Sequence, residues 1–344
     1  MVNGLTPVET NALWAVLAIG VLTVGYALVL RQLLLRQEQG TEQMQTVAGY
    51  FSSGAAAYLS GQVRLILLIA LLLAAILGAS AWFTPPSREA VARFGADTAR
   101  LWLVAGRAAA VLLGALSGYL VGQIGVSLTA ASIVRTTAAA RKGYNPALQV
   151  AYRSGAATGL LTVGLGLLGS TLLFLVFGPA SADILLSFAL GAVVATLVSR
   201  VSGGVYATAT TMGVDIASKG EQGVAADDPR NAASIATVLS DNADNAGGIA
   251  TDIFGSFEIA LVVSIVLGLV LGDFTAGPSG DGVFDLRFAL FPLVVRGIGA
   301  LASLIGNALV RTDDRQRNAQ AAINRGLLLA TLLTVPPSPR PTSS

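Results

Sequence analysis

The sequence contains neither cysteine nor histidine among its 344 residues. Without cysteine, the chain can form no disulfide and no thiolate metal site. Without histidine, it has no imidazole general base, no Ser-His triad and no His-ligated zinc or haem. Any chemistry must therefore rest on carboxylates, Lys and Arg, hydroxyls, backbone groups or a hard cation.

Charged residues are also scarce. Asp, Glu, Lys and Arg make up 12% of the chain, hydrophobic residues make up 54%, and the mean hydropathy is +0.71. A soluble domain carries about a quarter charged residues. The net charge of +2 gives no reason to expect a nucleic-acid partner. These features exclude an ordinary soluble protein, and we expect an integral membrane protein in contact with the lipid bilayer.

The length of the uncharged runs predicts the fold class. A helix needs roughly 20 apolar residues to cross the hydrocarbon core. We expect an all-α, multi-pass transmembrane helix bundle of seven spans plus a truncated eighth, whose last run is too short to cross. One run is interrupted only by Arg296, and another reaches full length when it is extended back to about Ala246. The runs are 12–30, 65–84, 108–134, 154–182, 184–199, 259–272, 288–310 and 326–335.

The placement of Lys and Arg predicts the orientation. Most of the 21 basic residues lie in alternate connections, which the positive-inside rule places in the cytoplasm, with the N-terminus outside. Because no basic n-region or cleavage site precedes the first run, we expect a retained span rather than a signal peptide. The low share of lysine among the basic residues favours a prokaryotic plasma membrane. The connections are 31–64, 135–153, 200–245 and 311–325.

The domain organisation follows from the same pattern. We expect residues 1–335 to form a single transmembrane domain, with a cytoplasmic polar segment at about 200–245. Residues 336–344 have the Pro- and Ser-rich composition of a disordered tail. The chain ends within its eighth predicted span, which is the pattern of a fragment, a frameshifted gene or a half-length protein that assembles with another chain.

The polar segment is where we expect the chemistry. Asp215 and Lys219 are four residues apart, which places them on one face of a helix. Carboxylates at helical spacing suit a hard cation such as Mg²⁺, which takes oxygen ligands and bridges phosphate groups. Lys and Arg nearby would hold anionic oxygens, so a phosphate-type substrate at a membrane face is the first chemical interpretation. Three further residues, Asp241, Asn245 and Asp252, follow at helical intervals and lead into a span.

The sequence of this segment resembles a known family. Residues 202–258, SGGVYATATTMGVDIASKGEQGVAADDPRNAASIATVLSDNADNAGGIATDIFGSFE, resemble the signature region of membrane-bound inorganic pyrophosphatases, the pyrophosphate-energised proton or sodium pumps. The DDPRN motif in this context is specific. Further similar stretches extend the resemblance over nearly the whole chain: SSGAAAYLSGQVRLI (52–66), GYLVGQIGVSLTAASIVRTTAAARKG (118–143), AYRSGAATGLLTVGLGLLG (151–169) and INRGLLLA (323–330).

The resemblance implies a function and a set of site residues. Members are all-helical homodimers that bind Mg-pyrophosphate in a cytoplasmic funnel, hydrolyse it, and move H⁺ or Na⁺ through a charged gate below. Asp215, Lys219 and Asp227 match substrate-binding positions, and the matched metal ligands are Asp215, Asp227 and Asp241. The matched catalytic positions are Asp241 and Asn245, and those of the gate are Arg200, Asp252 and Glu258. Glu258 matches only in residue type, so snorkelling or a hydrogen bond within the helix is the alternative interpretation of it.

Several positions depart from the family pattern. Asn245 stands where the family has an Asp that helps to activate water, and an amide cannot take up a proton. The neighbouring Asp244 could replace it only with a shifted register, since one residue turns a helix by about 100°. Thr208, Thr211 and Thr237 also replace family Lys or Asp residues. Family chains are about twice as long, and their second half supplies further carboxylates and lysines.

Three functional hypotheses follow. The first is a pyrophosphate-driven ion pump, truncated and with a degraded site, which acts as a homodimer or with a complementary C-terminal half. The second is a catalytically inactive membrane scaffold of the same family. The third is an unrelated secondary transporter with an ion path lined by Arg200, Asp252 and Arg296, which the resemblance disfavours. We expect the isolated chain to hydrolyse pyrophosphate poorly or not at all.

Overall fold

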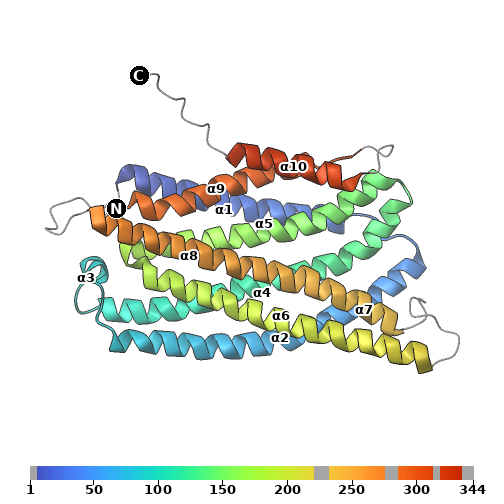
Figure 1. Cartoon of the computed structure of the whole chain (residues 1–344), viewed down its shortest axis with the longest axis horizontal. Helices are drawn as coiled ribbons and strands as arrows, with labels where there is room; N and C mark the ends of the chain where they lie inside the picture. Colours follow the sequence, from blue (N-terminus) through green and yellow to red (C-terminus); the bar gives the residue numbers. More distant parts are fainter. Residues whose placement is uncertain (1–5, 221–231, 276–285, 313–317, 335–344) are drawn as a thin grey trace, which may run out of the picture.

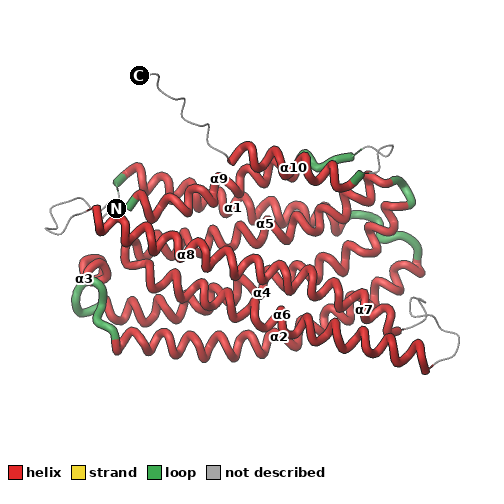
Figure 2. Tube along the Cα trace, in the orientation of Figure 1, coloured by secondary structure: helices red, strands yellow, loops and turns green. Residues whose placement is uncertain are grey.

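The fold is a bundle of long helices that run along one another. The computed structural model describes residues 6–220, 232–275, 286–312 and 318–334, and within these ranges it contains helices and loops but no strand (Figure 2). The long helices are α1 (Pro7–Leu35), α2 (Glu42–Phe83), α4 (Ala99–Ala140), α5 (Tyr144–Phe177), α6 (Ala182–Gly220), α8 (Ala250–Thr275) and α9 (Arg287–Ala308). The shorter elements are α3 (Arg88–Phe94), the 3₁₀ turn η1 (Gly178–Ser181), α7 (Ala232–Asn242), the π-helix η2 (Ala243–Ile249) and α10 (Ala319–Thr334).

The long helices alternate in direction, as expected for a multi-pass membrane protein (Figure 1). Six continuous helical stretches of the described residues are long and apolar enough to cross a membrane. One of them, 144–216, contains α5, α6 and the turn η1 between them, so it passes through the bundle twice. The seven expected spans therefore correspond to the seven long helices, and α10, with 16 residues, is the short eighth.

The connections are much shorter than the charge pattern predicted. Residues 31–64 and 135–153 were expected to be cytoplasmic connections, but only residues 36–41 separate α1 from α2, and 141–143 separate α4 from α5. The prediction placed the helix ends where the apolar runs end. A charge ends an apolar run without breaking a helix, because Arg, Glu and Gln are good helix formers. The helices therefore extend beyond their apolar runs at this end of the bundle.

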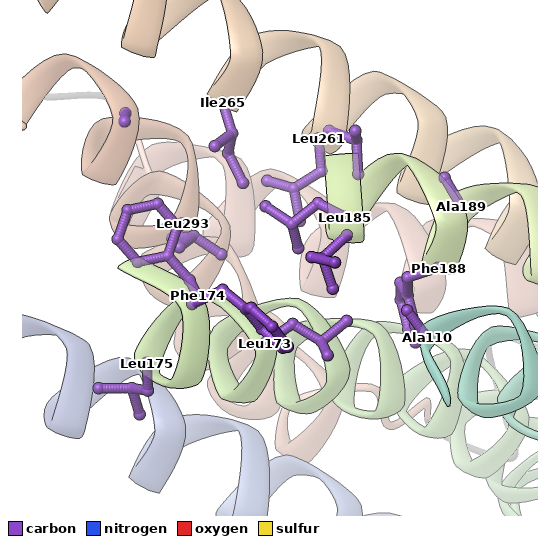
Figure 3. Close-up of a cluster of buried hydrophobic side chains, with 14 of the residues drawn as sticks. Ala110, Leu173, Phe174, Leu175, Leu185, Phe188, Ala189, Leu261, Ile265 and Leu293 are labelled. Atoms are coloured by element: carbon purple, nitrogen blue, oxygen red, sulfur yellow. The ribbon is translucent and has the colours of Figure 1, made fainter. Parts of the chain in front are cut away.

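Aromatic and branched side chains from several helices fill the centre. Phe174 from α5 and Phe188 from α6 are fully buried, together with Leu185, Ile265 and Leu293 (Figure 3). By contrast, only 28% of the most apolar 18-residue stretch of α2 is buried inside the protein. Exposing so many leucines would be unfavourable in water and is expected in lipid, so this surface supports a membrane-spanning bundle.

Small residues allow α4 and α6 to approach closely. A Cβ at Gly114 would lie 2.0 Å from the carbonyl oxygen of Phe188, and one at Gly191 would lie 2.0 Å from that of Val111. Lipid tails are as apolar as leucine, so helices in a membrane associate through such close packing. Any larger side chain at either position would force the two backbones apart.

Candidate functional site

The acidic residues at the polar end lie on two packed helices. Asp215 on α6 and Asp241 on α7 are both exposed, and α7 lies beside α6 (Figure 1). A hydrogen bond of 2.7 Å between the hydroxyls of Thr210 and Ser240 joins the two helices next to Asp241. Asp215 and Asp241, two of the predicted metal positions, therefore share one end of the bundle.

Two of the predicted residues are described only in part or not at all. Lys219 lies on α6, four residues after Asp215, as the spacing predicted, but the described part of the structure does not include its side chain. Asp227 lies outside the described residues. Within the described ranges, no three acidic side chains form a group that could hold a metal ion. The carboxylates of Asp215 and Asp241 have the hard oxygen donors that Mg²⁺ prefers, but they do not make a metal site by themselves.

A change of helix type lies between Asp241 and the membrane span. The chain is continuously helical from α7 through the π-helix η2 into α8. A π-helix bonds residue i to i+5 and is frequent at functional sites. It also shifts the residues beyond it relative to a regular α-helix, so the faces that α-helical spacing assigns to residues 243–249 do not hold here.

Arg200 pairs with Asp244, the residue next to Asn245. The Nη1 atom of Arg200 donates to Oδ1 of Asp244 over 3.2 Å, and the two side chains remain 41% and 30% exposed. Arg200 is on α6 and Asp244 on η2, so the pair joins these elements. It is partly hydrated, and its direct contribution to stability is expected to be small.

Asn245 lies on another side of the same helix. It is exposed and lines a cavity of about 530 Å³, together with Tyr152 and Thr162 of α5 and Asn307 of α9. The side-chain oxygen of Asn307 is buried and has no hydrogen-bond partner among the described residues. The structure thus directs Asp244 toward Arg200, whereas Asn245 lines a mostly apolar cavity that contains a few polar side chains. Asp244 does not take the place of Asn245.

Asp252, a predicted gate residue, forms no ion pair in the described structure. It lies one turn beyond Gly248 on α8, and its side chain is exposed. Gly248 itself packs against Arg200, since a Cβ there would lie 3.2 Å from Cδ of that residue. Asp252 is eight residues after Asp244 and six before Glu258 on the same continuous helix, so it lies between the Arg200–Asp244 pair and Glu258.

Glu258, the third predicted gate residue, forms a separate ion pair deeper in the bundle. Its Oε1 accepts a hydrogen bond of 2.5 Å from Nη2 of Arg296 on α9. The Glu258 side chain is 0% exposed and that of Arg296 is 13% exposed. Fourteen helical residues separate Asp244 from Glu258, which corresponds to about 20 Å along the axis. The three gate residues are therefore spread along the bundle and do not form one cluster.

The surroundings of the Glu258–Arg296 pair show how tightly it is enclosed. Gly166 of α5 faces it, and a Cβ at that position would lie 1.9 Å from Oε1 of Glu258. The second carboxylate oxygen, Oε2, and Nη1 of Arg296 are buried without a hydrogen-bond partner among the described residues. A charged pair with unpaired atoms in a membrane interior is unfavourable, and such groups usually mark functional positions.

Sequence reasoning missed both partners. The partner of Glu258 could have been found from the sequence. Arg296 is the charged residue that interrupts the run 288–310, and this run follows the run 259–272, which Glu258 directly precedes. The partner of Arg200 could not, because the π-helix that sets the direction of Asp244 has no periodic signature. The roles assigned to Arg200, Asp252 and Glu258 stay predictions.

Comparisons with known proteins agree on one family. The sequence profile of inorganic H⁺ pyrophosphatases matches residues 21–338. A K⁺-insensitive pyrophosphate-energised proton pump from Chloroflexus aurantiacus is 50% identical over 332 residues, which are 96% of this chain and 43% of the relative. A second such pump, from Moorella thermoacetica, is 34% identical over 321 residues, or 92% of this chain and 42% of the relative. The chain thus spans less than half the length of these curated relatives.

Proposed function

Since the chain belongs to the inorganic H⁺ pyrophosphatase family, we propose that it forms one half of a pyrophosphate-energised proton pump. The proposed reaction is hydrolysis of Mg-pyrophosphate at the polar end of α6 and α7, coupled to ion movement through the bundle. One observation carries this proposal. A single continuous helical rod, from α7 to α8, bears Asp241 at the polar end, Asp244 in the first ion pair and Glu258 in the second.

The proposed substrate site uses the predicted residues at the polar end. Lys219 would bind pyrophosphate oxygens, while Asp215, Asp227 and Asp241 would supply carboxylates to Mg²⁺. The bound ion would neutralise charge on the phosphoryl group during transfer. We place this end at the cytoplasmic face of a prokaryotic plasma membrane, in line with the distribution of basic residues. The remaining groups would come from a complementary C-terminal half within a homodimeric assembly.

The proposed ion path runs along α8. Arg200 and Asp244 form its upper level, Asp252 follows further along α8, and Glu258 with Arg296 forms the lower level. A shift of the π-helix would move Asp244, Asp252 and Glu258 together relative to Arg200 and Arg296, because η2 is continuous with α8. The proposed ion is H⁺, as in the names of the two relatives described above, and Na⁺ is the alternative that the resemblance allows.

An inactive scaffold is the second candidate, and Asn245 favours it. The amide lines a mostly apolar cavity, and Asp244 is engaged with Arg200, so no described carboxylate occupies the place of the water-activating acid. In this reading the chain keeps the bundle and its ion pairs but not the hydrolysis.

Mg²⁺-dependent phosphate release from pyrophosphate distinguishes the two candidates. We would measure it for the purified chain alone and after co-expression with the C-terminal part of the Chloroflexus relative. We expect little release from the chain alone and restored release with the added half, which Asp241→Ala abolishes. Asp97→Ala, an exposed acid at the opposite end of the bundle, is the matched control. Absence of release from a folded, co-assembled complex would support the scaffold.

If release is restored, ion transport is tested in proteoliposomes. Acidification of the lumen on addition of pyrophosphate, in buffer free of Na⁺, is the expected result for a proton pump. Acidification that is absent without Na⁺, together with uptake of labelled Na⁺, would contradict the choice of H⁺.

A further inference from the structure

A small basic cavity lies at the same end of the bundle as the candidate site but between different helices. It has a volume of about 200 Å³ and lies where α1 ends, α4 ends and α5 begins. Its polar lining residues are Gln37, Glu38, Arg135, Lys142, Gln149 and Arg153. Three basic side chains thus face one carboxylate, and the cavity carries an excess of positive charge. None of these residues belongs to the predicted pyrophosphate site.

Arg135 is built into the wall of this cavity. It is only 7% exposed, although it is a charged residue. Its Nη1 donates to the carbonyl of Ala131 over 2.6 Å, and its Nη2 donates to the carbonyl of Leu35 over 3.2 Å, which caps the end of α1. Its Nε is buried and has no hydrogen-bond partner among the described residues. A buried guanidinium with a free donor and no carboxylate partner suits an anion.

Arg153 supplies a second guanidinium. It is half-buried and forms no hydrogen bond or ion pair with any residue that the structure describes. Lys142 is held differently, because its Nζ pairs with Oε2 of Glu38 over 2.7 Å. This contact lowers the pKa of the Glu38 carboxyl, first through the hydrogen bond and then through the charge of Lys142. Glu38 therefore stays ionised and occupies Lys142, while Arg153 remains available.

The depth of the cavity indicates which anion it meets. Arg135 is the first charged residue after the uncharged run 108–134, and Arg153 is the last before the run 154–182. Both guanidiniums are therefore at the edge of the apolar layer, where the phosphate groups of lipids lie and where basic pockets between helices bind them. The N-terminus of α5, near Pro146 in the lining, adds a favourable dipole for a negative charge.

We propose that this cavity is a phosphate-group binding site, with Arg153 and Arg135 as its anion-binding residues and Glu38 as an internal competitor. The phosphate group comes from an anionic lipid headgroup or from free phosphate in the cytoplasm. The site does not depend on pyrophosphate hydrolysis, so it can be tested on a chain with no enzymatic activity.

Binding to the purified, delipidated chain in neutral detergent tests the proposal with two probes. Inorganic phosphate is titrated by calorimetry, and phosphatidylglycerol is titrated by native mass spectrometry, with phosphatidylcholine as the zwitterionic reference. Arg153→Gln should weaken binding of whichever probe binds the parent by about tenfold, because a charge-assisted hydrogen bond is lost. Glu38→Gln should strengthen it by about two- to threefold, because Lys142 is released. The control is Arg88→Gln, an exposed arginine at the opposite end of the bundle.

The pattern across variants decides the outcome. Binding of phosphatidylglycerol alone with the expected variant effects identifies a lipid site, and binding of inorganic phosphate alone identifies a free-phosphate site. Arg153 forms no hydrogen bond or ion pair with a described residue, so its variant should keep the melting temperature of the parent. The gain in Glu38→Gln cannot result from unfolding. The proposal is overturned if neither probe binds the parent, if Arg153→Gln binds as the parent does, or if Arg88→Gln loses as much as Arg153→Gln.

Discussion

The two ion pairs of the bundle differ mainly in their access to water. The Arg200–Asp244 pair has side chains that are 41% and 30% exposed and a separation of 3.2 Å, whereas Glu258 in the other pair is 0% exposed and lies 2.5 Å from Arg296. Both join α8 or its π-helical extension to a neighbouring helix. The same chemical groups therefore occupy two very different environments along one helical rod.

This difference determines what each pair can do. A hydrated pair gains little from its Coulomb attraction and can exchange partners readily. A buried pair has lost its hydration, so either charge alone would be left uncompensated in a low-dielectric interior. In the proposed pump, the upper pair is suited to respond to events at the polar end. The lower pair is suited to act as a barrier that an ion crosses only when the pair separates.

Breaking the buried pair should have the largest effect. We expect Arg296→Ala to lower the free energy of unfolding by about 3–5 kcal/mol, because Glu258 loses its counter-ion. The double variant Glu258→Gln/Arg296→Met should recover most of this loss, since no charge is then left unpaired. The measurement is denaturation of the purified chain in detergent, followed by circular dichroism. If the single and double variants are equally destabilised, packing rather than charge explains the effect.

The enclosure of the same pair can be tested without changing a charge. Gly166→Ala places a Cβ against Oε1 of Glu258 and Nη2 of Arg296, so the pair must shift, at a cost of about 1–3 kcal/mol. Gly159→Ala on the same helix is the matched control, because a Cβ there meets nothing within 4 Å. The control should be neutral or slightly stabilising, since alanine favours a helix. Equal melting temperatures for the two variants would show that the Glu258 and Arg296 side chains can move away from position 166 without loss of stability.

The sequence predicted the seven long helices well because membrane spans leave a strong and local signal. A run such as 154–182 has no charge, and an α-helix is the structure that satisfies its backbone in lipid. The helix ends were predicted poorly, since α2 begins at Glu42 and not near residue 65. Beyond the apolar layer, hydropathy no longer reports on the backbone.

The site was predictable only where it depends on spacing within one helix. Asp215 and Lys219 lie on α6 as expected. The partner of Arg200 depends on a π-helix 44 residues further along the chain, and that of Glu258 depends on how α8 and α9 pack. Contacts between helices are set by the whole bundle, so periodicity along one segment cannot specify them.

The hydrated pair should matter less for stability than the buried pair. We expect Asp244→Asn to change the free energy of unfolding by no more than about 1 kcal/mol. Asp241→Asn, an exposed acid without an ion pair in the described structure, should change it even less. Both are measured in the same denaturation assay. A loss of several kcal/mol for Asp244→Asn would show that the Arg200 pair is shielded from water in the folded protein and would remove the contrast between the two levels.

The smallest expected effect is the response of each pair to salt, and it separates them most directly. At 1 M salt the screening length is about 3 Å, which is similar to the separation of the Arg200–Asp244 pair. The difference in free energy of unfolding between the parent and Asp244→Asn should therefore be present at low salt and absent in 1 M NaCl. The deficit of Arg296→Ala should persist, because ions do not reach Glu258, whose side chain is 0% exposed. If salt reduces both differences alike, the lower pair is hydrated, and an open aqueous path to Glu258 would replace the barrier proposed for it.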